Sequence, residues 1–396
     1  MVFLCMSIID INDLSVETAK SKYDLITKLC WNLLKSNTPL TNDDENEINS
    51  LLMNSEVNKH PYIRHSLYEL KFLSKILFEE DRDKLIEIIR GLINDVFNCY
   101  CVSSAYILIG LIEIKLGSFE FGCYHIMRAN ANYNKNNVVT RFFSYSRAVC
   151  LPDMLLFGVD FYPYKYKYFE QKISNDKSLE NVLLVSGNKE YLLKYLPNYC
   201  KSVKQRHNNP LLFHIHFVFD ENIEFKDLEI IKQILENYGI DYEISYTLIP
   251  YFWNDKRTFY ACSRYLFAAQ ILSKYKNGIL ITDLDYQLTE DCTNFYNIIK
   301  EYDVAFKVQN NCASILPWLK VMCGTIYVNS TTNGLFILKC FSRAFSFSFN
   351  PINFNWGLDQ NIWGGIYYLA KKMNISHYEI KKDCFTVPYD IKNQHN

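Results

Sequence analysis

Two aspartates stand one residue apart, directly after an apolar run, in the stretch GILITDLDYQL at residues 278–288. In an extended chain residues i and i+2 point the same way, so the carboxylates of Asp283 and Asp285 can face one point. Burying two carboxylates is costly unless something neutralises them. A hard cation such as Mg²⁺ or Mn²⁺ does so and keeps positions open for phosphate oxygens. An isolated D-x-D pattern is more often a solvated turn, so the surrounding elements must decide between the two interpretations.

Strands and helices alternate along the second half of the chain, from Asn181 onward. The predicted strands are the apolar runs NVLLVSG, LLFHIHFVFD, DYEISYTLI and ILITDLD, and segments with helical periodicity separate them. This alternation predicts an α/β fold with a mostly parallel sheet flanked by helices. Ligands bind such sheets at the carboxyl ends of the strands, where Asp283 and Asp285 lie. The position favours a metal and phosphate site over a solvated turn.

The first half of the chain has another pattern, because its apolar residues recur at helical spacing from residue 15 to about residue 150. We therefore predict an all-α domain of helical hairpins over residues 1–150. Residues 151–180 are predicted to be the connection to an α/β domain over residues 181–396.

One predicted hairpin carries small residues at regular positions. Gly110, Gly117, Gly122 and Ala129 are separated by 7, 5 and 7 residues. Small residues let two antiparallel helices touch closely, with Gly117 in the turn between them. The spacing resembles a single tetratricopeptide repeat. Such a domain either packs without a ligand of its own or offers a surface for a protein partner or for self-association.

Composition narrows the class of protein. The 396 residues hold 42 basic and 43 acidic side chains, a balance that argues against a nucleic-acid-binding protein. The 13 scattered cysteines indicate buried reduced thiols. The N-terminus lacks the features of a signal peptide, and no apolar window reaches the roughly 18 residues of a membrane span. We expect a cytoplasmic protein without a membrane span.

Five motifs in a fixed order make residues 181–370 resemble the family 8 glycosyltransferases, which are nucleotide-sugar enzymes of the GT-A fold. The motifs are LLVSGNKEYLLKYLPNYCKSV, FYACSRYLFAAQIL, GILITDLDYQL, IYVNSTTNGLFIL and WGLDQNIW. The matching positions are Tyr191, Lys201, Ser202, Arg264, Asp283, Asp285, Asn333, Gly334, Asp359 and Gln360. IYVNSTTNGLFIL is similar to a strand of the family, with Asn333 and Gly334 nearest the match.

The resemblance implies transfer of a sugar from a nucleotide-diphosphate donor, with a UDP-sugar as the first candidate, to a glycan, lipid or protein acceptor. It implies that Asp283 and Asp285 hold Mn²⁺ or Mg²⁺ and that Asp359 and Gln360 are catalytic. The donor-binding residues that it implies are Ser186, Gly187, Asn188, Tyr191, Arg264, Asp283, Leu284, Asn333 and Gly334.

Each of these roles has a structural alternative. A glycine at position 187 lets backbone approach a nucleotide. Tyr191 could stack on the uracil or pack on its helix. Arg264 could pair with the diphosphate, because its planar fork suits phosphate, or form a surface ion pair. Asp359 could face the donor sugar or stabilise a helix N-terminus.

One departure from the family leaves the third metal ligand open. The family's C-terminal HxxGxxKPW motif is absent, and neither His377 nor His395 has a fitting spacing. Trp356 would line the acceptor site.

Two other functions remain as alternatives: an interaction protein with a degenerate transferase domain, and a D-x-D phosphatase. The phosphatase motif D-x-D-x-T ends on Gln287 here and so lacks its threonine.

Overall fold

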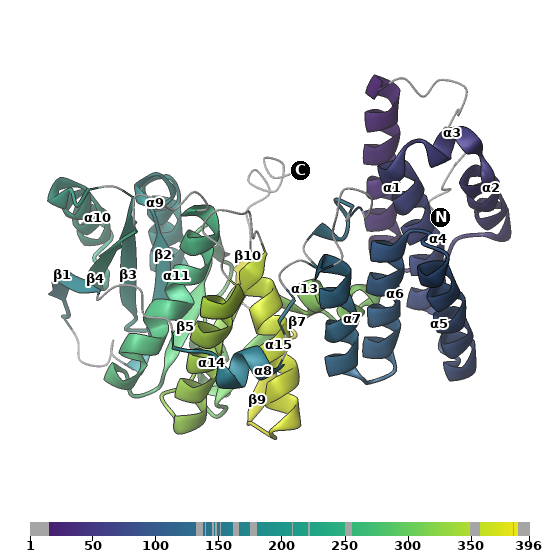
Figure 1. The fold of residues 1–396 in the computed structure, drawn as a ribbon. Helices are drawn as coiled ribbons and strands as arrows, with labels where there is room; N and C mark the ends of the chain where they lie inside the picture. Colours follow the sequence, from purple (N-terminus) through teal and green to yellow (C-terminus); the bar gives the residue numbers. More distant parts are fainter. Residues whose placement is uncertain are drawn as a thin grey trace. The chain divides into compact units, whose positions relative to one another are not determined.

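The structure is a computed structural model that describes a large part of the chain. The described residues are 16–131, 138, 140–144, 146, 149–150, 152–160, 166–174, 180–207, 209–220, 222–249, 256–348, 357–382 and 384–386. They form two compact units, a helical unit and an α/β unit (Figure 1). The helical unit takes Met1–Leu151 together with Gln309–Lys320, and the α/β unit takes Pro152–Val308 together with Val321–Asn396.

The helical unit is built from consecutive helices, most of which bury one face. They are α1 (Val16–Ser36), α2 (Asn42–Met53), α3 (Ser55–Asn58), α4 (Pro61–Phe78), α5 (Arg82–Phe97), α6 (Val102–Lys115) and α7 (Phe119–Ala131). The inserted segment adds the 3₁₀ turn η5 (Cys312–Ile315) and α13 (Pro317–Lys320). Local signals set several boundaries: Thr41 and Asp44 form a capping box at the start of α2, and Asp81 caps α5.

Helices α6 and α7 form the predicted close hairpin. A Cβ atom on Gly110 would lie 2.5 Å from the Gly122 carbonyl oxygen, and a Cβ on Gly122 would lie 2.5 Å from that of Gly110. The two backbones are therefore in direct contact, which only glycine permits at these positions. Gly117 has a φ of +93°, the left-handed conformation that ends α6 and turns the chain.

A polar cluster centred on Glu69 lies inside the helical unit. Its Oε1 accepts a hydrogen bond from the Ser104 hydroxyl at 2.6 Å, and its Oε2 accepts one from Thr140. His65 Nδ1 lies 2.8 Å from the same Ser104 oxygen. Burial raises the pKa of Glu69 to about 8 and lowers that of His65 to about 4. Both side chains are therefore held uncharged at neutral pH.

The α/β unit contains an eight-stranded sheet in the order β1-β4-β3-β2-β5-β8-β7-β9. Figure 1 shows the strands β1, β4, β3, β2 and β5 next to one another in this order across the unit. The strands are β1 (Lys167–Lys172), β2 (Val182–Gly187), β3 (Leu212–Phe219), β4 (Asp241–Leu248), β5 (Ile279–Thr282), β7 (Val304–Val308), β8 (Val321–Val328) and β9 (His377–Glu379). A separate two-stranded sheet joins β6 (Gln287–Leu288) to β10 (Phe385–Thr386).

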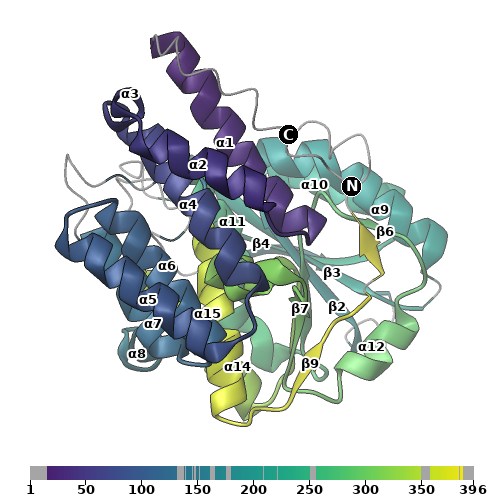
Figure 2. The same cartoon turned by 90° about the vertical axis from the view of Figure 1, so that its right-hand side faces the viewer.

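Helices cover both faces of this sheet. They are α8 (Pro152–Phe157), α9 (Lys189–Arg206), α10 (Phe225–Asn237), α11 (Lys256–Ile271) with η4 (Leu272–Lys274), α12 (Thr293–Ile299), α14 (Thr332–Ser348) and α15 (Leu358–Lys372). Figure 2 shows α9, α10 and α12 on one side of the strands and α14 and α15 on the other. The core under α9 and α10 holds apolar side chains of β2, β3 and β4, which are buried over most of their length because helices lie on both sides.

The predicted fold class is confirmed: an all-α region precedes an α/β sheet that is mostly parallel. Strands β2, β3, β4 and β5 run the same way, and β7 and β9 share their direction because β8 lies antiparallel to both β5 and β7. Only β1 and β8 run the other way.

The predicted division at 150 and 180 stays a prediction. Residues 151–180, expected to be a connection, contribute α8 and the edge strand β1. Residues 309–320 follow β7 in the chain but pack with the helical unit.

In the described part of the chain, no helix combines the length and apolar character needed to span a membrane. The described cysteines are free thiols, most of them buried.

Candidate active site

Asp283 and Asp285 lie where predicted, at the carboxyl end of β5. The Asp283 amide donates to the Gly324 carbonyl in β8 at 3.0 Å, which holds the turn against the neighbouring strand. Leu284 between them is 1% exposed and packs in the core under α9, so it anchors the turn. The two aspartates on either side are half-buried.

Arg264 of α11 connects two carboxylates at this end of the sheet. Its Nη1 donates to Asp283 Oδ1, and its Nη2 lies 3.8 Å from Asp359 Oδ2. Nη2 also points to the Cys323 carbonyl at 3.4 Å. The arginine is 5% exposed, so the alternative of a surface ion pair is wrong. A buried guanidinium of this kind needs the carboxylates around it.

Asp285 has an environment that suits a cation. Burial and the Asp283 charge raise the pKa of Asp285, while a hydrogen bond from the Tyr191 hydroxyl opposes that shift. The Oδ1 atom of Asp285 is buried and has no hydrogen-bond partner among the described residues. Buried polar atoms nearly always have partners, so an unpaired carboxylate oxygen beside a second carboxylate points to a group that binds here.

Asp359 reaches the site from the first turn of α15. Gly357 precedes this helix with a φ of +85°, a left-handed conformation that favours glycine. Asp359 Oδ1 accepts the Gln360 amide at 2.9 Å. Burial raises the pKa of Asp359 and the Arg264 charge opposes the rise. Gln360 is half-buried in the same turn.

The end of β2 lies beside these groups, because β2 pairs with β5 in parallel. Ser186 Oγ lies 2.7 Å from Ser263 Oγ of α11, and Asn188 caps α9 by accepting the Tyr191 amide at 3.2 Å. A Cβ on Gly187 would lie 3.1 Å from the Tyr191 ring, so glycine allows the ring to sit against the strand. Burial, followed by the charges of Asp283 and Asp285, raises the pKa of Tyr191. Its hydroxyl thus stays a hydrogen-bond donor to Asp285.

Asn333 and Gly334 do not join this cluster, which corrects the prediction from the NGLFIL match. They belong to the first turn of helix α14 and not to a strand. In the β5–β8 pair Thr282 faces Thr325 and Ile279 faces Val328, so the chain after Val328 leaves from the opposite edge of the sheet. There Asn333 Nδ2 donates to Asp303 Oδ2 at 2.9 Å.

Gly324 and Tyr286 are site neighbours that the sequence interpretation missed. Gly324 lies in β8 beside Asp283, and a Cβ there would overlap the Tyr286 hydroxyl. The glycine in CGTIYV, inside a strand-like run, is the signal that could have identified this position.

The two aspartates fit a divalent cation. Mg²⁺ is commonly held by one or two carboxylates, with water and substrate phosphates as the other ligands. Across the described ranges, no group of three or more His, Cys, Asp or Glu side chains is placed to hold a metal ion. His377 lies in β9 opposite Val304, at the far edge of the sheet, so it does not complete the shell. Trp356 and His395 lie outside the described residues.

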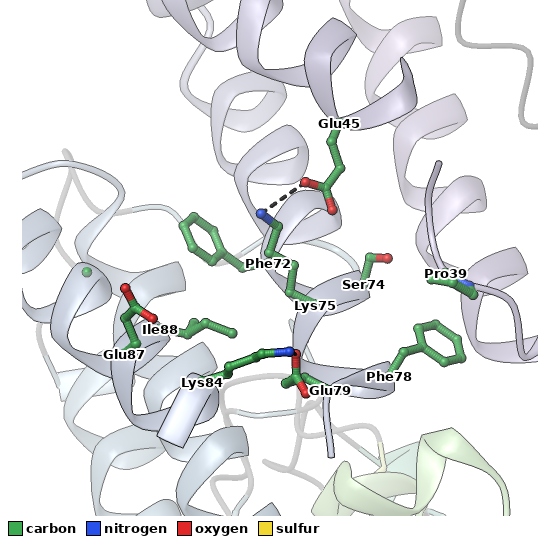
Figure 3. A pocket seen from close by; sticks show the side chains of 11 residues that line it. Pro39, Glu45, Phe72, Ser74, Lys75, Phe78, Glu79, Lys84, Glu87 and Ile88 are labelled. Atoms are coloured by element: carbon green, nitrogen blue, oxygen red, sulfur yellow. Dashed lines mark ion pairs between the residues drawn. The ribbon is translucent and has the colours of Figure 1, made fainter. Parts of the chain in front are cut away.

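A hollow of about 500 Å³ occurs elsewhere, in the helical unit. It is lined by Pro39, Glu45, Phe72, Ser74, Lys75, Phe78, Glu79, Lys84, Glu87, Ile88 and Gly91. Figure 3 shows the two lysines of the hollow, each beside a glutamate: Lys75 lies 2.9 Å from Glu45, and Lys84 lies 3.6 Å from Glu79. Both lysines of the lining are paired, the Ser74 hydroxyl accepts a hydrogen bond from the Leu40 amide at 2.9 Å, and the lining holds no histidine, so we assign no catalytic role to this hollow.

Comparison with known proteins gives only distant likenesses. No protein-family model matches the sequence, and no curated protein matches it. Among solved structures, the glycosyltransferase GlyE of Streptococcus pneumoniae TIGR4 is 17% identical over 51% of this chain and 45% of its own, with a TM-score of 0.36. The match thus spans less than half of GlyE.

Two further structures are similar over about the same share of the chain. The galactosyltransferase LgtC, in complex with donor and acceptor sugar analogues, is 14% identical over 47% of this chain and 70% of its own, with a TM-score of 0.33. Mouse xyloside xylosyltransferase 1 is 11% identical over 50% of this chain and 84% of its own, with a TM-score of 0.34. At TM-scores this low, the likenesses carry no argument about this chain's activity.

Proposed function

We propose that the α/β unit is a metal-dependent glycosyltransferase of the GT-A type, similar to family 8. It would move a sugar, as a hexosyl or related transferase, from a nucleotide-diphosphate donor to a glycan, lipid or protein acceptor. A UDP-sugar is the first donor to test, with Mn²⁺ or Mg²⁺ as the metal.

The observation that carries the proposal is the buried, unpartnered Oδ1 of Asp285 beside Asp283, at the carboxyl edge of the sheet. Leaving such an oxygen unpaired costs free energy, which a bound cation would recover. Parallel sheets bind their ligands at this edge. Nearby Asp359 and Arg264 supply further polar groups facing the same place.

The chain's own residues have distinct tasks in this proposal. Arg264 holds the Asp283 carboxylate through its Nη1 atom, and Tyr191 donates to Asp285, so both metal ligands are oriented before anything binds. Asp359 and Gln360 would face the donor sugar from the start of α15. A bound cation would supply charge stabilisation to the departing diphosphate. Ser186, Gly187 and Asn188 would line the nucleotide side.

Calorimetric titration with UDP, with and without Mn²⁺, tests this function. We expect binding that needs the metal and that Asp285→Asn removes. Asp291→Asn is a matched control, because Asp291 lies beyond the turn, beside His207. Absence of UDP, GDP and other nucleotide-diphosphate binding, or binding indifferent to Mn²⁺ and to Asp285→Asn, would overturn the proposal.

The second candidate is an interaction protein whose transferase domain is inactive. It is favoured by the lack of a third protein ligand in the described ranges. In that case UDP would not bind, or would bind without turnover of any donor. The phosphatase alternative is weaker, and release of phosphate from an aryl phosphate would support it.

The helical unit would serve protein contact or self-association, and its α6–α7 hairpin would be a single tetratricopeptide-like repeat. The support is the glycine contact between the two helices. Sedimentation of the full chain over a range of concentrations tests self-association.

A further inference from the structure

Lys307 lies in β7, at the same edge of the sheet as the paired aspartates. In the β7–β8 pair Phe306 faces Ile326 and Val308 faces Val321, and in the β8–β5 pair Thr325 faces Thr282. Lys307 is therefore two strands away from the turn that follows Thr282, and only one residue before the end of its own strand.

The side chain of Lys307 approaches that turn from the α9 face of the sheet. The β7–β8 pairing shifts register between Phe306 and Val308, so the direction of the Lys307 side chain follows from its contact with Tyr286, which belongs to the core under α9. The Lys307 Nζ atom lies over the Tyr286 ring, 5.9 Å from its centroid. Tyr286 follows Asp285 directly and crosses β8 at Gly324, where no side chain intervenes.

The balance of charges at the site leaves a role for the positively charged Lys307 ammonium. Asp283, Asp285 and Asp359 bring three carboxylates, and Arg264 is already engaged with two of them. A divalent cation would offset the carboxylates, but a diphosphate adds further negative charge. A lysine ammonium on a flexible stem suits phosphate oxygens, and Lys307 contacts the residue that directly follows Asp285.

We propose that Lys307 binds the diphosphate of the donor and of the departing nucleotide, with its alkyl chain resting on Tyr286. This inference rests on the proposed glycosyltransferase function. The ring packing would hold the lysine stem in place while the ammonium swings toward the phosphates.

The test is calorimetric titration of the full chain with UDP, UMP and uridine in the presence of Mn²⁺. For Lys307→Gln we expect UDP affinity to fall about tenfold, the size that the loss of one charge-assisted hydrogen bond gives. Affinity for uridine should be unchanged, because uridine has no phosphate. Lys307→Arg, which keeps the charge, should recover most of the loss.

Lys300→Gln is the matched control. Lys300 is also half-buried, but it precedes β7 at the opposite edge, where its Nζ donates to Asn297 Oδ1 at 3.0 Å. The Lys300→Gln variant should bind UDP like the wild type. All variants should keep the unfolding midpoint of the wild type.

The outcomes separate this inference from the function beneath it. If the wild type does not bind UDP, both are overturned. If the wild type binds UDP and Lys307→Gln binds it equally well, only the role of Lys307 is overturned. If Lys307→Gln weakens uridine as much as UDP, the lysine supports the structure of the turn and the inference is also wrong.

Discussion

Arg264 and Asp283 form an ion pair at the carboxyl edge of the sheet, in which the arginine side chain is 6% exposed and the aspartate side chain 29%. The pair links helix α11 to the turn after β5. It also leaves the second guanidinium nitrogen, Nη2, within 3.8 Å of Asp359 at the start of α15. Three elements that are distant in sequence are therefore joined through one buried side chain.

Replacing Arg264 with Met should destabilise the α/β unit. Removing one partner of a buried ion pair leaves an uncompensated charge, and the free energy of unfolding should fall by about 2–4 kcal/mol. Urea denaturation measures this loss. Arg343→Met is a control, because Arg343 pairs with Asp160 at 2.8 Å on a more exposed surface and should cost less. Equal losses for the two variants would show that the Arg264 pair is not special.

Replacing Tyr191 with Phe should weaken Mn²⁺-dependent UDP binding severalfold without unfolding the chain. The change removes the hydroxyl that donates to Asp285 and so loosens a metal ligand. Calorimetry measures the affinity. Tyr195→Phe keeps the edge-on ring contact with Tyr191, at 4.7 Å, and should bind UDP normally. Unchanged affinity in Tyr191→Phe would remove this tyrosine from the site.

The stability of the helical unit should depend on the pH through Glu69. Burial raises the pKa of Glu69 to about 8 in the folded state, against an ordinary value of 4.5. The folded state therefore binds more protons than the unfolded chain between these values. The free energy of unfolding should fall as the pH rises through this window and level off above it.

Glu69→Gln should remove that pH dependence, since glutamine stays neutral. Denaturant midpoints at pH 5 and pH 8.5 provide the comparison. Glu80→Gln serves as the control, because the Glu80 side chain is 85% exposed. An identical pH slope in the wild type and in Glu69→Gln would contradict the assignment.

Replacing Gly110 with Ala should destabilise the α6–α7 hairpin by about 1–3 kcal/mol, because the added methyl meets backbone at 2.5 Å. Gly91→Ala is matched to it. Gly91 also lies inside a helix, α5, but a Cβ there has nothing within 4 Å, so alanine should stabilise by up to about 1 kcal/mol. The thermal unfolding midpoints of the two variants measure this difference. A Gly110→Ala protein as stable as Gly91→Ala would contradict the close contact between α6 and α7.

Local patterns were enough to predict the main architecture. The alternation of apolar runs with helical segments gives the parallel strands β2 to β5, and the position of Asp283 and Asp285 follows from it. Arg264, Tyr191 and Asp359 also reach the same edge. These features depend on short-range periodicity and on a general rule for where strands of a parallel sheet end.

The errors arise where periodicity is ambiguous or where contacts are distant. NGLFIL is an apolar run that suits a strand or a buried helix, and it belongs to α14, which takes Asn333 and Gly334 away from the site. The strand beside Asp283 is β8, with Gly324. The packing of residues 309–320 with the helical unit depends on contacts far apart in sequence, which no local pattern contains.

The central claim is tested most directly by donor turnover. Purified full-length protein is incubated with UDP-, GDP- and other nucleotide-sugars with Mn²⁺, and the free nucleotide released is measured, beside Asp285→Asn and the Asp291→Asn control. We predict metal-dependent release from at least one donor in the wild type and in Asp291→Asn, and loss of that release in Asp285→Asn. Release that persists in Asp285→Asn or without metal, or no release from any donor, would contradict the account.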